Sequence, residues 1–315
     1  MAELILHDDR AVVERRPALG YAMAAGAAAL FGVNGSVAKV AIRSGLPADR
    51  LTEIRCAGAF AGLVLLAVAA WMPELRVERR ELPFLAAFGI GGVALVQWTY
   101  FVAIGRLPVG IALVIQYVAP LLVALYARVV LHEHVRARVW AALALSLAGL
   151  VLVVRLWQGL AFDGIGVLAA MGSMVTFAFY LLMAERGITR RSRVPLLAWG
   201  FAFATLFWSL VLPWWSYPGA RLGAHASLLG RLDAHQLPVA ALVAWVVVLG
   251  TVVPFVLIVG ALKHVPATRV GIVAMLEPVT ATLVAWIWLG EALAAVQLVG
   301  AAVVLAGIGL AQSAR

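Results

Sequence analysis

Long apolar runs alternate with short polar connections along the whole sequence, and this alternation constrains the fold more than any other feature. Ten such runs cover approximately residues 18–41, 51–72, 82–104, 108–128, 138–155, 164–184, 195–215, 238–262, 266–289 and 292–312. About 20 apolar residues in a helix cross a bilayer core of roughly 30 Å, because an α-helix rises about 1.5 Å per residue. The chain is 12% charged, about half of the roughly 25% typical of a soluble domain. We therefore predict an all-α integral membrane protein with ten transmembrane helices and no soluble domain.

The second half of the chain repeats the spacing of the first. Pro108 and Pro120 recur as Pro266 and Pro278 at an offset of 158 residues, and a glutamate follows each pair 13 residues on. Further upstream the offset is 146, so the second copy has gained 12 residues, which we assign to the connection at 216–237. The predicted organisation is a polar tail (1–17), a first five-helix repeat (18–155) and a second five-helix repeat (156–315). Because five is an odd number, the second repeat must be inverted in the membrane relative to the first.

The distribution of basic residues predicts the orientation of the chain. Of the 24 Lys and Arg residues, fifteen fall on the side of the N-terminus, six on the opposite side and three within the apolar runs. Since Lys and Arg accumulate in cytoplasmic loops, we expect both termini in the cytoplasm and the chain in a bacterial cytoplasmic (inner) membrane. We therefore attribute the net charge of +9 to topology and not to nucleic-acid binding. The first 17 residues hold no short apolar run before a cleavage site, so we expect no cleaved signal peptide.

Little in the sequence supports cofactor chemistry. Cys56 is the only cysteine, which excludes an internal disulfide and a cysteine metal cluster. His132 and His134 flank Glu133, but two histidines beside a turn supply too few ligands for a metal. The sequence also lacks a phosphate-binding loop of the Gly-x-x-x-x-Gly-Lys-Ser/Thr type. We expect no metal, no cofactor and no enzymatic activity.

Glu277 is an acidic residue in the middle of a predicted span. It lies 11 residues after Pro266 and 12 before Leu289, and a charge at that depth costs roughly 2.5–3.5 kcal/mol on insertion scales. The first repeat has Ala119 at the matching position, so the fold itself does not require an acid there. Because removal from water favours the neutral form of a carboxyl group, we hypothesise that Glu277 exchanges protons in competition with substrate. The alternative is a structural glutamate that bonds the backbone opened by Pro278 or pairs with a basic side chain.

Other polar and aromatic side chains within the spans are candidates for a substrate site beside Glu277: Asn34, Gln97, Tyr100, Gln116, Tyr117 and Tyr180. The aromatic rings could equally belong to the core or face lipid. Lys39 and Arg55 lie near the predicted outer ends of the first two spans. Their side chains either extend to the membrane interface or form a cationic vestibule that attracts solutes bearing a carboxylate.

Three prolines, Pro120, Pro254 and Pro278, lie within spans. Proline removes a backbone donor and displaces the carbonyl four residues earlier, so we predict kinks that either act as hinges or only shape the packing. Glu133 and Glu291 follow the fourth and ninth runs and are predicted to cap the helices that come next.

Several of these segments resemble a known family. The run Gln116-Tyr-Val-Ala-Pro120 leading to Glu133, and Leu276-Glu277-Pro278 leading to Leu289-Gly290-Glu291, resemble the paired signatures of the drug/metabolite transporter superfamily, EamA type. The segment Leu30-Phe-Gly-Val-Asn34, the Gly45-Leu-Pro47 turn and Arg55 are similar to that family as well. The sequence departs from its pattern at Phe31, where tryptophan is frequent, and at His132, where glycine is frequent.

This resemblance implies a secondary transporter that exports small metabolites, amino acids among them, by alternating access between the two halves. The cationic outer rim of Lys39, Arg43 and Arg55 favours a zwitterionic or anionic amino acid. The alternatives are a lipid flippase or a channel-like facilitator. An integral-membrane enzyme is disfavoured, because it would need a nucleophile with a base, or paired carboxylates, at membrane depth. The expected partners are the small-molecule substrate and membrane lipid, and oligomerisation is left open.

Overall fold

The computed structural model describes residues 16–313 except 105, 108, 156–162 and 291–292. Within these residues, nine helices are long and apolar enough to cross a membrane, and the apolar helix α7 (Ala137–Val153) is shorter. The strands of the described part form one short antiparallel hairpin. The prediction of an all-α integral membrane protein is therefore confirmed, and α7 corresponds to one of the shorter apolar runs.

The first half of the chain supplies two continuous helices, two interrupted ones and α7. The continuous helices are α1 (Pro17–Arg43) and α2 (Ala48–Ala69). The third span consists of α3 (Leu82–Ala87), the π-helical segment η3 (Phe88–Ala94) and α4 (Leu95–Ile104). The fourth span is divided into α5 (Val109–Gln116) and α6 (Ala119–Val129).

The second half has the same series of elements. Its continuous helices are α8 (Gly164–Ile188), α9 (Arg193–Val211) and α14 (Ala295–Ser313). The interrupted spans are α10 (Val239–Val247), π-helical η8 (Val248–Val252) and α11 (Val253–Ala261), then α12 (Ala267–Ala274), α13 (Leu276–Val284) and π-helical η9 (Ala285–Leu289). Corresponding elements begin at 17 and 164, 48 and 193, 82 and 239, 109 and 267, and 137 and 295. These starts follow the offsets of the sequence repeat.

One helix end differs clearly from its predicted position. The seventh apolar run extends to about residue 215, whereas α9 ends at Val211. Leu212 is extended, with φ −124° and ψ 107°, and Pro213 follows it. The ring of a proline disfavours the helical conformation of the residue before it, so Pro213 ends the helix despite the apolar residues that follow.

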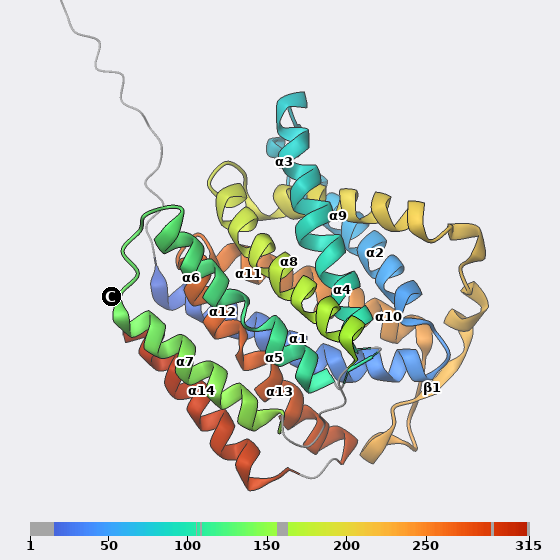
Figure 1. The fold of residues 1–315 in the computed structure, drawn as a ribbon. Helices are drawn as coiled ribbons and strands as arrows, with labels where there is room; N and C mark the ends of the chain where they lie inside the picture. The colour runs from blue at the N-terminus through green and yellow to red at the C-terminus, as the bar shows by residue number, and fades with distance from the viewer. Residues whose placement is uncertain (1–15, 105, 108, 156–162, 291–292, 314–315) are drawn as a thin grey trace, which may run out of the picture.

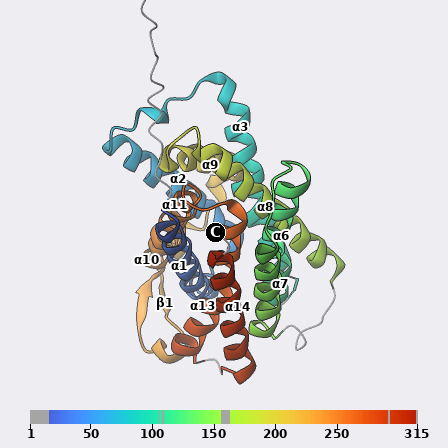
Figure 2. The ribbon, with the colours of Figure 1, turned by 90° about the vertical axis from the view of Figure 1, so that its left-hand side faces the viewer.

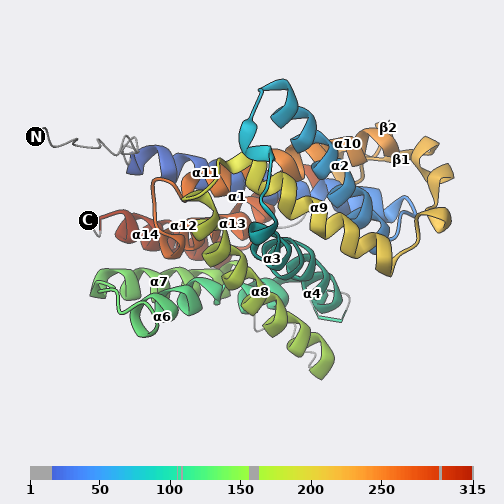
Figure 3. The same cartoon turned by 90° about the horizontal axis from the view of Figure 1, so that it is seen from above.

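Helices from the two halves interleave. α2 packs along α9, and α7 packs along α14, with these last two side by side in Figures 1 and 3. α1 lies against α11, α12 and α13 of the second half, whereas α8 lies against η3, α4 and α5 of the first. In Figure 2, α13 and α14 lie between α1 with α10 and α11 on one side and α6 with α7 on the other. The first helix of each half is thus embedded in the opposite half.

Glycines allow the close approach of α7 and α14. A Cβ on Gly300 would lie 2.7 Å from the carbonyl oxygen of Gly149 and 2.7 Å from the amide of Val153. A Cβ on Gly149 would lie 2.8 Å from the carbonyl oxygen of Gly300. Because lipid supplies no hydrophobic drive between helices, small residues at such crossings are how membrane helices gain van der Waals contact.

The connection between α9 and α10 is folded. It holds the hairpin of β1 (His225–Ser227) and β2 (Gln236–Pro238), in which Ala226 is opposite Leu237. Its 3₁₀ turns are η5 (Trp214–Ser216), η6 (Gly219–Gly223) and η7 (Gly230–Leu232). The start of α1 and the end of α14 lie at one end of the bundle, and this connection lies at the other (Figures 1 and 3).

The folded connection packs on the ends of three spans. Its Ala226 belongs to a buried apolar cluster with residues of α1, α2 and α10. The indole of Trp288 in η9 donates a hydrogen bond to the carbonyl oxygen of Leu228 (2.9 Å). The side chain of Arg221 lies against Gly45 in the turn between α1 and α2. Residues 214–238, called here the outer strap, therefore join the ends of α1, α2, α10 and η9.

Candidate polar site between the two halves

The two interrupted fourth spans meet at Glu277. Tyr117 lies in the two-residue break between α5 and α6, and Glu277 lies in the first turn of α13, just after the break at Met275. The hydroxyl of Tyr117 donates to Oε2 of Glu277 at 2.6 Å. Tyr117 is buried and Glu277 is half-buried. The structure thus joins two of the predicted site residues, one from each half.

Arg55 approaches the same carboxylate from α2. Its Nε donates to the hydroxyl of Thr251 in η8 at 2.6 Å, and this hydroxyl donates to the carbonyl oxygen of Val246 at 2.8 Å. Thr251 is fully buried, and Arg55 and Glu277 interact electrostatically. The guanidinium therefore points into the protein, so for Arg55 the structure contradicts the reading as an interfacial side chain. Basic groups at membrane depth take this orientation because lipid cannot solvate them.

Two residues of α4 complete the polar cluster. Tyr100 is half-buried and interacts electrostatically with both Glu277 and Tyr117. Gln97, one turn earlier, donates from Nε2 to the carbonyl oxygen of Val93 at 3.0 Å and to Sγ of Cys56 at 3.7 Å. The cluster of Arg55, Tyr100, Tyr117 and Glu277 thus draws on four spans, three of which are interrupted.

Asn34 and Tyr180 occupy matching places in the two halves. They are related by the offset of 146, and Gly250 and Gly92, against which they pack, are related by the offset of 158. A Cβ on Gly250 would overlap the amide of Asn34, and a Cβ on Gly92 would lie 3.1 Å from Cα of Tyr180. Gly92 belongs to η3 and Gly250 to η8. Each of these two π-helical segments, η3 and η8, therefore packs against a polar residue from the first helix of the opposite half.

Aromatic rings surround the buried side of this cluster. Tyr180 lies 5.6 Å from Phe255 and 5.7 Å from Phe88, measured between ring centroids. Phe177 stands edge-on to Tyr117 with a centroid distance of 6.0 Å. These contacts show that Tyr117 and Tyr180 belong to one interior cluster.

Three polar atoms of the predicted site have no hydrogen-bond partner within the part of the chain that the structure describes: Asn34 Oδ1, Gln97 Oε1 and the hydroxyl of Tyr180. All three side chains are at least nine-tenths buried. Buried polar atoms are normally paired, and an unpaired one costs about 1–3 kcal/mol. These three atoms are therefore available to bond a small polar solute.

The interruptions coincide with the three predicted prolines. Pro120 and Pro278 occupy the first turns of α6 and α13, and Pro254 occupies the first turn of α11, directly after η8. The interruptions are structural facts, while movement about them stays a prediction.

The remaining candidates lie outside the cluster as described. Lys39 is exposed near the end of α1, and Gln116 is half-buried at the end of α5. Glu133 lies four residues before the first residue of α7, whose N-cap residue is Arg136. Glu291 falls outside the described residues. Site roles for Lys39 and Gln116, and capping by Glu133 and Glu291, stay predictions.

Within the described ranges, no group of three or more His, Cys, Asp or Glu side chains could hold a metal ion. What the cluster offers instead is a cation and an anion at membrane depth. A guanidinium can bind a carboxylate through two parallel hydrogen bonds. A carboxyl group can accept hydrogen bonds from an ammonium group or take up a proton.

Comparison with known proteins identifies the family of the chain. A model of the EamA-like transporter family matches residues 18–155 and 164–312. The chain is 30% identical over 232 residues to an uncharacterised transporter of Archaeoglobus fulgidus, which covers 73% of this chain and 75% of the relative. It is 26% identical over 246 residues to the threonine/homoserine exporter RhtA of Escherichia coli K12, with 77% and 75% covered.

A further relative is the uncharacterised inner membrane transporter YicL of Salmonella typhimurium, 24% identical over 271 residues, with 84% of this chain and 85% of the relative covered. A solved crystal structure that is 20% identical in sequence has the same fold, with a TM-score of 0.72 over 93% of this chain and 96% of the other. Because the family match extends over both halves, the chain belongs to the EamA-like transporter family.

Proposed function

We propose that this chain is a secondary carrier that exports small zwitterionic solutes, amino acids first among them. In this proposal two inverted five-helix halves alternate in opening the cluster around Glu277 to the two sides of the membrane. Membership of a transporter family supports the general activity. The activity of one relative, a threonine/homoserine exporter, supports amino acids as the first substrates to test.

The observation that carries the proposal is a cation and an anion within the spans of opposite halves, Arg55 and Glu277, which interact electrostatically. Arg55 is oriented by Thr251 and Glu277 by Tyr117. A zwitterionic amino acid has a carboxylate that matches the guanidinium and an ammonium group that matches the glutamate. Both contacts would be charge-assisted and therefore stronger than neutral hydrogen bonds.

Glu277 also provides a route to proton coupling. A protonated carboxyl group cannot balance the charge of an ammonium group, so the proton and the amine compete for the same side chain. An inward proton gradient would then drive solute outward, provided that each molecule exported is exchanged for one proton at Glu277.

In the proposed orientation the chain lies in a bacterial inner membrane, with both termini on the cytoplasmic side. The excess of Lys and Arg on that side supports the orientation, and the similarity to an inner membrane transporter supports the location. Reporter fusions at Arg315 and within residues 221–231 should report opposite sides of the membrane. Reports from the same side would contradict the topology.

The test of function uses the purified chain in proteoliposomes with threonine and homoserine. A carrier should catalyse counterflow, the exchange of labelled for unlabelled solute against a gradient, which a channel-like facilitator cannot do. Glu277→Gln keeps the size of the side chain and removes its titration, so it should abolish the dependence on a pH gradient. Glu74→Gln, at an exposed carboxylate between α2 and α3, is the matched control. Counterflow with an unchanged pH response in Glu277→Gln would reject proton coupling, and the absence of counterflow would reject the carrier.

A further inference from the structure

A polar cavity lies apart from the cluster around Glu277, and none of the residues of that cluster lines it. It is an open cavity of about 540 Å³ between α3, the segment after α6 and the last turns of α8. This volume is within the range of roughly 300–1,000 Å³ found for small-molecule sites. Arg138, at the start of the neighbouring helix α7, donates to the carbonyl oxygen of Ser313 at 3.4 Å. The cavity therefore belongs to the end of the bundle at which α1 begins and α14 ends.

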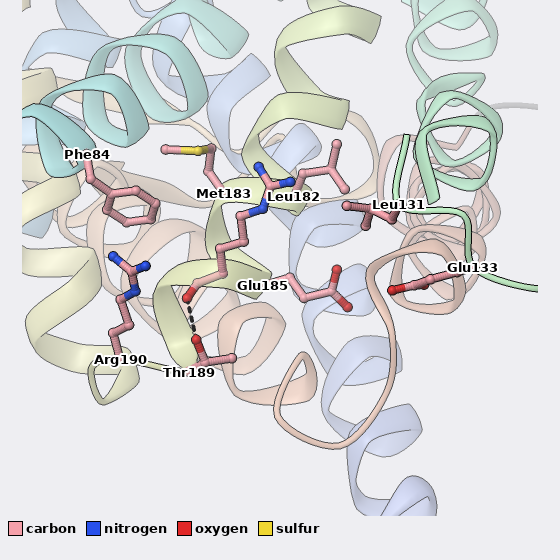
Figure 4. Close-up of a pocket in the computed structure, with 9 residues that line it drawn as sticks. Phe84, Leu131, Glu133, Leu182, Met183, Glu185, Thr189 and Arg190 are labelled. Atoms are coloured by element: carbon pink, nitrogen blue, oxygen red, sulfur yellow. Dashed lines mark hydrogen bonds between the residues drawn. The ribbon is translucent and has the colours of Figure 1, made fainter. Parts of the chain in front are cut away.

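The walls of the cavity carry charges of both signs. Glu133 and Glu185 lie on one side of it, and Arg190 lies on the other beside Phe84 (Figure 4). Arg186 also lines the cavity, but its guanidinium already donates a hydrogen bond to the hydroxyl of Tyr126 and lies 5.3 Å from the centre of the Tyr126 ring. For the side chains of Glu133 and Arg190, the described residues contain no hydrogen-bond or ion-pair partner. These two side chains therefore present opposite charges to the cavity.

Glu185 connects the cavity to the helix that leads to Glu277. Its Oε1 accepts a hydrogen bond from the amide of Ala267 at 2.9 Å. Ala267 is the first residue of α12, whose N-cap residue, Pro266, makes no side-chain cap. α12 continues through a one-residue break into α13. One wall of the cavity is thus fixed to the span that carries the central carboxylate.

We propose that this cavity is a second binding site for a small zwitterion with a primary ammonium group. The ammonium group lies at the wall of Glu133 and Glu185, and the anionic end of the zwitterion lies at Arg190. The inference rests on the proposed function in that the ligand belongs to the chemical class taken at Glu277. The same chemistry occurs in a free amino acid and in the headgroup of an ethanolamine phospholipid.

Binding to the purified chain tests this site without relying on transport. The protein is placed in nanodiscs of phosphatidylcholine and phosphatidylglycerol, and saturation-transfer NMR measures binding of L-threonine and of O-phosphoethanolamine. Glu133→Gln and Arg190→Gln should each weaken the binding of at least one probe about tenfold, as expected for loss of a charge-assisted hydrogen bond. Glu74→Gln and Arg128→Gln, at exposed residues outside the cavity lining, should leave binding unchanged.

The outcomes separate this site from the central one. Probe binding that depends on Glu133 and Arg190 and persists in Glu277→Gln assigns the cavity site. Probe binding that is lost in Glu277→Gln and unchanged in both cavity variants overturns it while leaving the proposed function standing. If neither probe responds to Glu133 or Arg190, the cavity site is also overturned. Addition of phosphatidylethanolamine identifies the source of the ligand: displacement of the Glu133-dependent signal indicates the lipid headgroup, and persistence indicates the free solute.

Discussion

At the scale of single residues, the hydrogen bond between Tyr117 and Glu277 joins the two halves through one proton donor. Tyr117→Phe keeps the ring that meets Phe177 and removes only the hydroxyl. A hydrogen bond to a charged group contributes about 1.5–3 kcal/mol, so we expect the transport rate to fall about ten- to hundredfold while the protein inserts normally. Initial rates in proteoliposomes at matched protein density would measure this. A Tyr117→Phe variant with full activity would show that the bond does not orient Glu277.

Arg55 depends on a fixed geometry as well as a charge. Its Nε donates to Thr251, which leaves the terminal nitrogens to meet a carboxylate. Lysine has a single side-chain nitrogen, which cannot both bond the Thr251 hydroxyl as Nε does and present a fork of two nitrogens to a carboxylate. Arg55→Lys should therefore lose transport nearly as fully as Arg55→Gln, by about tenfold or more for a charge-assisted bond. Concentration dependence of the initial rate would measure it, and a rate for Arg55→Lys close to that of the unaltered chain would show that charge alone suffices.

The sequence indicates the titratable members of the site but not the hydroxyl that orients one of them. Glu277 is conspicuous because an acid within an apolar span is costly. Thr251 is not, because threonine is common in membrane helices and this one has Val93 at the matching position in the first half. The sequence feature that could have drawn attention to Thr251 is the preceding residue, Gly250, because it matches Gly92 at the offset of 158.

At the scale of elements, the crossing of α7 and α14 leaves no room for a side chain at Gly300. A Cβ there would meet backbone of the opposite helix, which cannot move aside as a flexible side chain can. Gly300→Ala should therefore destabilise the protein by about 1–3 kcal/mol, the usual effect of overpacking. Gly309→Ala lies on the same helix, where an added Cβ meets nothing within 4 Å, and should be neutral. Thermal unfolding of both variants in detergent would compare them; equal melting temperatures would contradict the close crossing.

The start of α8 depends on a single carboxylate. Asp163 accepts from the amide of Gly166 at 2.7 Å and pairs with Arg106 at 3.3 Å. The backbone hydrogen bond, and then the Arg106 guanidinium, hold the pKa of Asp163 below its usual range. Because the folded-state pKa is lowered, this stabilisation is present above the usual range and is lost as the pH falls through the folded-state value.

Asp163→Ala should accordingly lower the melting temperature at neutral pH, and the difference should disappear as the pH falls through the lowered pKa of Asp163. Asp163→Asn keeps a capping oxygen and loses the ion pair, so its melting temperature should lie between those of Asp163→Ala and the unaltered chain. Melting curves from neutral pH down into the acid range would show the convergence. A constant difference between Asp163→Ala and the unaltered chain across that range would contradict the assignment to the ionised carboxylate.

The sequence predicts the positions of spans better than their interruptions. Proline spacing indicates the breaks near Pro120 and Pro278, because proline removes a backbone hydrogen bond. Pro254 likewise marks the break at η8, whereas the π-helical segments η3 and η9 contain no proline. In η3 and η8, Tyr180 and Asn34 pack against a glycine.

At the scale of the whole molecule, the ten spans follow from apolar length, and the matched starts of corresponding helices follow from the repeat. The way the halves interleave does not follow from either. Period and hydrophobicity indicate which residues face away from water, but in lipid they do not indicate which helix is the neighbour. The embedding of α1 and α8 in opposite halves therefore needed the structure.

Transport should be blocked by fixing the outer strap to η9, because we expect the strap to separate from η9 when this end of the bundle opens. Leu228→Cys combined with Trp288→Cys places two thiols across the contact made by the Trp288 indole. A short bifunctional thiol reagent should stop counterflow in the double variant, and cleavage of the link should restore it. Each single variant treated with the same reagent is the control. Full counterflow in the linked protein would show that this end of the bundle need not open.

The outer strap also breaks the equivalence of the two sides. In a strictly symmetric inverted repeat, the two resting states are related by the two-fold axis in the membrane plane and have equal free energy, so an empty carrier divides its time equally between them. The strap has no counterpart of its length in the first half, so its contacts with η9 and with the α1–α2 turn exist at one end only. Each 1.4 kcal/mol by which they favour closure of that end makes the state that opens toward the termini about ten times more populated. The empty protein would then expose its binding site mainly on the side of the termini. A loop remote from the charged cluster would thus determine the side on which substrate binds, without altering the final equilibrium of transport.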